Sequence, residues 1–145
     1  MAKIETVKVT SKNLEGFLIE TKAGTHTVYV DQPTAMGGTD KGSTPLQYVF
    51  IALCGCLGTV AKIAAKQQHI DLRGFELTIE GDLNLEVLMG MESSDRPGFN
   101  GLKVHIKMDA DLSKEEKEKF VREVERRCPV SDNLMHNTPV EFVVE

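Results

Sequence analysis

Three cysteines, Cys54, Cys56 and Cys128, are the only strong nucleophiles in this sequence of 145 residues. As thiolates they can attack electrophilic oxygen or sulfur atoms, and the products are sulfenic acids or disulfides. The first ten residues contain no apolar export segment, so we expect a cytoplasmic protein whose thiols are reduced. Any disulfide is then expected to be a transient chemical intermediate.

Cys54 and Cys56 lie two residues apart in a segment whose pattern predicts a helix, so their side chains point about 200° away from each other. They cannot form a disulfide together or bind one metal ion while the helix is regular. This argues against a zinc site although the sequence contains four histidines. We expect neither a metal nor an organic cofactor. Burial without any reaction is the alternative for each of these two cysteines.

Cys128 has a different sequence environment, because Arg126 and Arg127 precede it and Pro129 follows it. Proline suits the first position of a helix, which places Cys128 at the N-cap. The positive end of a helix and neighbouring cations both favour a thiolate. A half-buried cysteine with no chemical role is the alternative.

The helix that carries Cys54 and Cys56 is predicted over residues 44–68. Thr44 and Gln47 have the spacing of a capping box, and Pro45 suits the first helical position. Because residues 46–57 are apolar nearly all round, we expect this helix to be buried.

Two glycines, Gly55 and Gly58, interrupt this helix at a cost of about 1 kcal/mol each relative to alanine. Another backbone packed closely against them is the expected compensation.

The other elements follow from periodicity and from turn residues. Alternation of apolar and polar residues predicts strands, and spacing of three and four predicts helices. Residues 73–84 and 102–109 are expected to pair as a hairpin. The order of the elements indicates an α+β fold. The predicted strands are 2–10, 17–21, 26–31, 73–84, 102–109 and 140–144, and the later helices are 113–127 and 129–135.

Length and composition predict one soluble domain over residues 1–145. The sequence is 41% hydrophobic and 27% charged, with a net charge of −5 and no tryptophan. Because no basic cluster is interleaved with aromatics, we expect no nucleic-acid partner. The uncharged run 42–61 contains proline, glutamine and glycines and ends at Lys62, so we expect no membrane span.

Two separated motifs resemble those of the OsmC/Ohr family. The first comprises Asp31–Pro33 (DQP), Gly37–Pro45 (GGTDKGSTP) and Ala52–Cys56 (ALCGC). The second is Cys128–Ser131 (CPVS), at the start of a late helix. The order of the predicted elements agrees with the family over the whole chain. The resemblance implies an intertwined α+β homodimer, in which antiparallel sheets wrap around long central helices.

The resemblance also implies a chemistry, that of a thiol-dependent peroxidase of the oxidative stress response. By motif position, Cys56 corresponds to the cysteine that attacks an organic hydroperoxide or hydrogen peroxide. Cys128 corresponds to the cysteine that resolves the sulfenic acid to a disulfide, which an external dithiol reduces. Cys54 corresponds to neither.

The sequence departs from the peroxidases of the family at two supporting positions. Those members carry an Arg in the N-terminal strands, which pairs with the thiolate, and a Glu in the first turn of the central helix. Here Leu46 and Gln47 occupy the helix position, and the first arginine is Arg73. Gln47, Arg126 and Arg127 are the candidates to support the thiolate instead, and the two arginines would supply the cation.

Two other functions stay open because of this departure. One is a non-peroxidatic dimer that binds a small hydrophobic or thiol-bearing ligand. The other is a redox sensor that uses the same cysteine pair.

Overall fold

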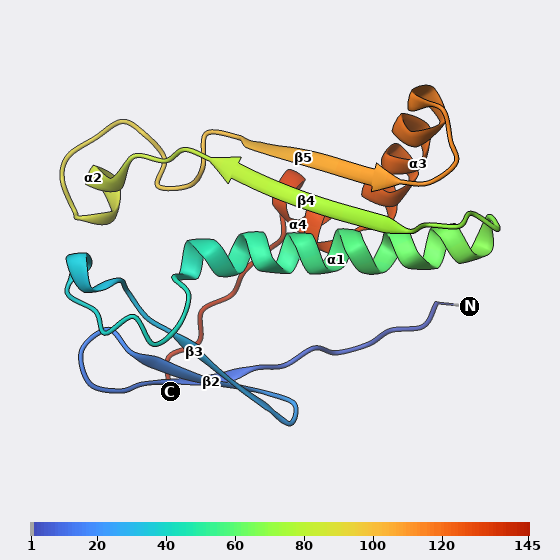
Figure 1. The fold of residues 1–145 in the computed structure, drawn as a ribbon. Helices are drawn as coiled ribbons and strands as arrows, with labels where there is room; N and C mark the ends of the chain where they lie inside the picture. Colours follow the sequence, from blue (N-terminus) through green and yellow to red (C-terminus); the bar gives the residue numbers. More distant parts are fainter. Residues whose placement is uncertain (1) are drawn as a thin grey trace. The chain divides into compact units, whose positions relative to one another are not determined.

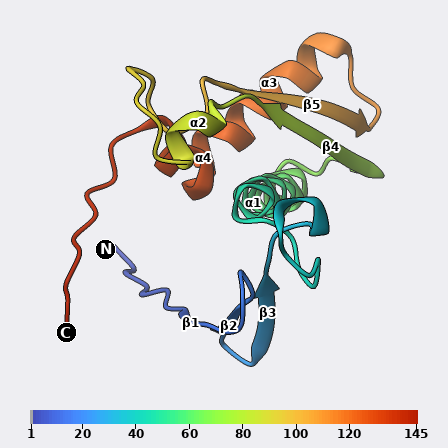
Figure 2. The ribbon, with the colours of Figure 1, turned by 90° about the vertical axis from the view of Figure 1, so that its left-hand side faces the viewer.

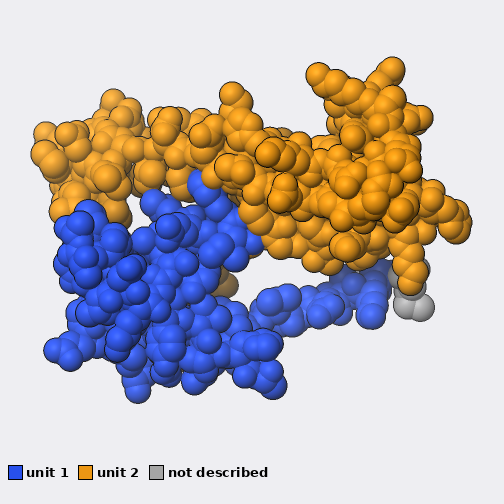
Figure 3. Space-filling model, viewed as in Figure 1, with its two compact units in different colours: residues 1–51 blue, residues 52–145 orange. Residues whose placement is uncertain are grey.

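A computed structural model describes residues 2–145, which form two compact units, residues 2–51 and 52–145 (Figures 1 and 3). The long helix α1, Pro45–Gln67, begins in the first unit and continues into the second. The two units are described in turn.

The first unit contains a three-stranded antiparallel sheet in the order β1-β2-β3. Its strands are β1 Thr10–Asn13, β2 Ile19–Ala23 and β3 His26–Val30. The third strand begins where the alternating pattern predicts it, and the second begins two residues later than predicted. A single 3₁₀ turn, η1 Thr34–Met36, follows in the loop that leads to α1.

A buried carboxylate, that of Asp31, organises this loop. Its side chain accepts hydrogen bonds from the backbone N–H groups of Gln32, Thr39 and Lys41 and from the Thr39 hydroxyl. These bonds, with the Thr39 hydroxyl first, lower the pKa of Asp31. A Cβ atom at Gly38 would overlap the carbonyl oxygen of Gln32, so this tight loop requires glycine there. The spacing of the first sequence motif is therefore explained by loop geometry.

The start of α1 confirms the predicted capping box. The Gln47 N–H donates to Thr44 Oγ1 at 3.2 Å, and Gln47 Oε1 accepts from the Thr44 N–H at 2.9 Å. The Tyr48 hydroxyl then donates to the Tyr29 carbonyl at 2.6 Å, which ties the first turn of the helix to β3.

The second unit contains the predicted hairpin of β4 Gly74–Gly81 and β5 Leu102–Asp109. The two strands pair in register from Gly74 opposite Asp109 to Gly81 opposite Leu102. A short helix, α2 Leu85–Leu88, lies in their connection, and α3 Lys114–Arg127 and α4 Pro129–Met135 follow. Figure 2 shows α1 nearly end-on with β4 beside it.

The core of this unit lies where α1, α3 and the start of α4 meet the inner face of the hairpin. Phe75, Leu77 and Ile79 alternate with exposed residues along β4 and contact this core from the hairpin. Its buried members are Leu53, Leu57, Val60, Ala61, Ala64, Ala65, Phe120, Val124 and Cys128.

The expectation that α1 is buried all round is wrong for the single chain. Ala52, Gly55 and Thr59 are exposed, because the described residues cover only one side of the helix. Apart from the adjoining residues and the backbone of α1 itself, no described atom lies within 4 Å of a Cβ built on Gly55 or Gly58, so residues 2–145 supply no close neighbour for them.

By length and composition α1 is the one described helix apolar enough to cross a membrane, with a mean hydropathy of 1.8. A core helix of a soluble protein has the same composition, so this property is weak evidence for a membrane span.

Two predicted strands are not formed. Residues 2–9 and 140–144 belong to no helix or strand in the described chain, and only Thr10 of the first prediction lies in β1. A strand needs a neighbour to satisfy its backbone N–H and C=O groups, and periodicity alone does not supply one. Their apolar side chains are exposed, with Val7 at 87% and Phe142 at 89%.

Candidate thiol site

Cys128 joins two helices, as the sequence predicts. It ends α3 and is the N-cap of α4, with Pro129 at the first helical position. Its Sγ accepts a hydrogen bond from the Ser131 N–H at 3.4 Å. The Ser131 hydroxyl is turned away and donates to Glu125 Oε1 at 3.4 Å. Ser131 was not predicted as a partner of the sulfur, although its position three residues after an N-cap is the signal in the sequence that indicates this bond.

The expectation that Cys128 favours the thiolate is wrong. The Cys128 side chain is only 1% exposed, and this burial raises the pKa of its thiol. The neighbouring Cys56 thiol raises the pKa further, whereas the Ser131 N–H lowers it. The loss of hydration therefore raises the pKa of Cys128 by more than the N–H groups at the start of α4 lower it.

The two arginines expected to support a thiolate are bound to other groups. Arg126 makes a bidentate contact with the Glu123 carboxylate, with N–O distances of 2.9–3.1 Å. Arg127 donates to Gln67 Oε1 at 3.0 Å and lies 3.7 Å from Glu123. Gln47, the third supporting candidate, is engaged in the capping box described above.

Cys56 and Cys128 lie near each other, and both are free thiols. Cys56 is half-buried and packs against the core cluster that contains Cys128. The topology thus brings together two cysteines that lie far apart in the sequence.

Cys54 is placed elsewhere, as its helical spacing from Cys56 predicts. It lines a cavity of about 420 Å³ together with Lys62, Arg73 and Phe75. The exposed residues Gly55 and Thr59 border the same cavity, so Cys54 belongs to the side of α1 that the chain leaves open.

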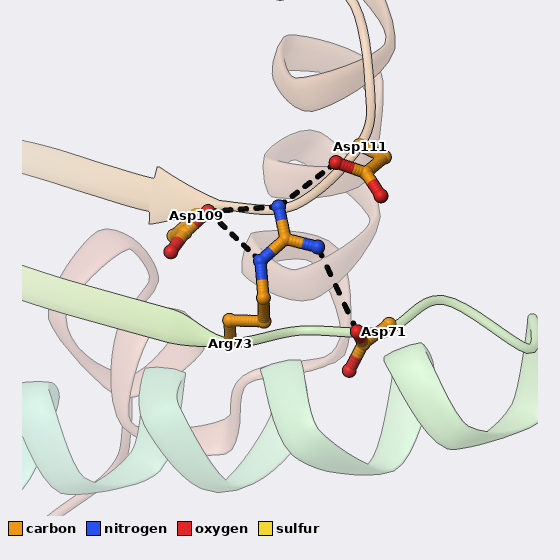
Figure 4. Close-up of polar contacts among 4 residues, drawn as sticks. All are labelled: Asp71, Arg73, Asp109 and Asp111. Atoms are coloured by element: carbon orange, nitrogen blue, oxygen red, sulfur yellow. Dashed lines mark hydrogen bonds and ion pairs between the residues drawn. The ribbon is translucent and has the colours of Figure 1, made fainter.

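Arg73, the first arginine of the chain, is held in a cluster of carboxylates (Figure 4). Its guanidinium contacts Asp109 and Asp111, each at 2.9 Å, and Asp71 at 3.6 Å. The hydrogen bonds to Asp111 and Asp109 raise the pKa of Arg73, and Arg73 in turn lowers the pKa of Asp111. The cluster joins the start of β4 to the end of β5. Asp71 just before β4, and Asp109 and Asp111 at the end of β5, are the signal in the sequence that could have predicted this cluster.

The sequence matches the family model described as OsmC-like protein over residues 38–143. The solved structures to which it is similar include an OsmC-like protein from Mycoplasma pneumoniae, with a TM-score of 0.78 and 18% identity over 90% of this chain and 88% of that one.

An organic hydroperoxide resistance protein OsmC from Legionella pneumophila gives a TM-score of 0.68 and 21% identity over 92% of this chain and 91% of that one. An organic hydroperoxide resistance protein from Elizabethkingia anophelis gives a TM-score of 0.67 and 18% identity over 94% of this chain and 93% of that one. No curated protein matches the sequence significantly. At these identities, the likeness to the solved structures establishes the fold.

Proposed function

Because the chain belongs to the family of OsmC-like proteins, we propose that it is a thiol-dependent peroxidase that reduces organic hydroperoxides or hydrogen peroxide. The observation that carries the proposal is the nearness of Cys56 and Cys128 at the core of the second unit. Two similar structures are named organic hydroperoxide resistance proteins, which supports a peroxide as substrate.

The proposed cycle has three steps. The Cys56 thiolate bonds to the distal oxygen of the hydroperoxide, the O–O bond breaks, and the alcohol leaves after taking up a proton. Cys56 is then a sulfenic acid. The Cys128 sulfur attacks it, the S–O bond breaks, and water leaves as the disulfide forms. An external dithiol reduces this disulfide by thiol–disulfide exchange and is itself oxidised.

The difference in burial between the two cysteines suits these roles. Cys56 is half-buried, so part of this residue is accessible from solution, as a peroxidatic cysteine requires. Cys128 is buried and needs to reach only the sulfenic acid next to it. Its raised pKa disfavours the thiolate, which makes direct attack of Cys128 on a peroxide slower.

The test is a titration of the reduced full-length protein with cumene hydroperoxide, followed by peptide mapping without reductant. One equivalent of peroxide per chain is expected to consume two thiols and to give a disulfide between the Cys56 and Cys128 peptides. Cys54 should be recovered as a free thiol. If both Cys56 and Cys128 remain free at a fivefold excess of peroxide, the proposal fails.

Gln47 and the two arginines favour a second candidate function, binding of a small hydrophobic or thiol-bearing ligand without turnover. Gln47 is neutral and engaged with Thr44, at the helix position where the resemblance expects a glutamate. Arg126 and Arg127 are paired with other side chains. Thiols that stay free in the titration, together with a ligand that co-purifies with the protein, would support this function.

We also propose that the protein is a homodimer whose second copy covers the exposed side of α1 and the chain ends. Val7, Phe142 and Val144 are 87%, 89% and 96% exposed, which is costly for apolar side chains in water. Both ends carry strand periodicity and find no neighbouring strand in the described chain. Light scattering at micromolar concentration should give twice the chain mass of 16.0 kDa. A mass of one chain would contradict the proposal.

A further inference from the structure

A hollow of about 470 Å³ lies between β5 and α3 in the second unit. Its floor is formed by Val104, Ile106 and Met108 of β5 and by Val121 of α3, all of them half-buried. Val104 and Met108 also contact the buried cluster, whereas in the described chain Ile106 and Val121 do not. The floor therefore keeps apolar surface that a hydrocarbon chain can cover.

The rim of the hollow is basic. Lys114, Lys117 and Arg122 line it together with a single acid, Glu118. Lys117 is half-buried. This basic rim contrasts with the protein as a whole, which carries a net charge of −5. Within residues 2–145, none of these three cations has a carboxylate within the 4.0 Å of an ion pair. Lys117 acts on Asp111 only through its charge, and that carboxylate is already bound to Arg73.

We propose that this groove between β5 and α3 binds amphipathic carboxylates of the straight-chain fatty-acid type. The hydrocarbon chain lies on Ile106 and Val121, and the carboxylate is held by Lys117 and Arg122. The volume falls in the range of about 300–1,000 Å³ typical of small-molecule sites. Small hydrophilic anions gain nothing from the apolar floor, and neutral hydrocarbons gain nothing from the cations.

The first test is a titration of the full-length, reduced, ¹⁵N-labelled protein with decanoate, followed by amide chemical shifts. Saturable shifts are expected in residues 104–108 and 114–122. Octanoate should bind more weakly, since each buried methylene tightens binding by up to roughly fourfold. Decanol, which has the same chain without the charge, should also bind more weakly than decanoate.

Charge variants separate this site from general attraction to the surface. Replacing Lys117 and Arg122 together by glutamine should weaken decanoate binding about fivefold, the loss expected for two exposed ion pairs. Decanol binding should not change. The matched control is Lys119→Gln, on the same helix but outside the groove, which should leave the decanoate affinity unchanged.

A variant of the floor gives the complementary result. Val121→Ser, at a half-buried position, should weaken decanoate and decanol alike. The proposal is overturned if decanoate does not saturate, if its shifts fall outside the groove, or if Lys119→Gln weakens binding as much as the double variant. It is also overturned if the same amides shift when the protein alone is concentrated, because a second copy would then fill the groove. None of these outcomes depends on peroxidase activity.

Discussion

Replacement of Cys56 by serine is expected to lower the rate of hydroperoxide reduction at least about a thousandfold, the scale seen when a nucleophile is removed. A serine hydroxyl is not ionised near neutral pH and cannot form the sulfenic acid on which the cycle depends. The measurement is steady-state turnover of cumene hydroperoxide with dithiothreitol as the reducing dithiol.

Variants of the two other cysteines distinguish the proposed roles. Cys128→Ser should still reduce about one equivalent of peroxide per chain and then accumulate the Cys56 sulfenic acid, which dimedone traps and mass spectrometry detects. Cys54→Ser is the matched control on the same helix and should turn over at the rate of the natural sequence. Full activity of Cys56→Ser, or loss of activity only in Cys54→Ser, would contradict the assignment.

Phe120→Ala should lower the free energy of unfolding by about 3–5 kcal/mol, the usual cost of removing a buried phenylalanine ring. The Phe120 side chain is 3% exposed and lies in the cluster that contains Val124 and Cys128. Its removal leaves a cavity in this cluster that the surrounding side chains can fill only in part. Urea denaturation followed by circular dichroism under reducing conditions measures the loss.

Two comparisons make the Phe120 measurement specific. Phe120→Leu keeps most of the apolar volume and should be less destabilising than the alanine variant. Leu88→Ala, in α2 at 66% exposure, should change the stability by no more than about 0.5 kcal/mol. If Leu88→Ala were as destabilising as Phe120→Ala, this result would contradict the placement of Phe120 inside the core and of Leu88 outside it.

Helix starts were predictable from the sequence because they depend on residues three apart. The capping boxes of Thr44 with Gln47 and of Ser113 with Glu116 are both formed. Cys128 is likewise the N-cap of α4, as its position before Pro129 indicates. In each case the bonding partners are neighbours in the chain, so the tertiary fold is not needed to identify them.

The ionisation of Cys128 was not predictable in this way. Its sequence neighbours, Arg126 and Arg127, suggested a thiolate, yet Arg126 is paired with Glu123 on the same helix and Arg127 with Gln67, which the fold brings near. Burial against the core reverses the expected direction of the pKa. Since the hydration of a thiol depends on everything packed around it, sequence neighbours alone could not predict the direction of the pKa shift of Cys128.

The sequence by itself determined the family motifs, the α+β order of elements and the opposite orientations of Cys54 and Cys56, because each depends on local spacing along the chain. The tertiary structure decided that Cys56 and Cys128 lie together, that Arg73 is held by carboxylates and that one side of α1 is open. It also decided that residues 2–9 and 140–144 do not form strands in the single chain. These features depend on contacts between distant segments, and a strand forms only where another strand can share its hydrogen bonds.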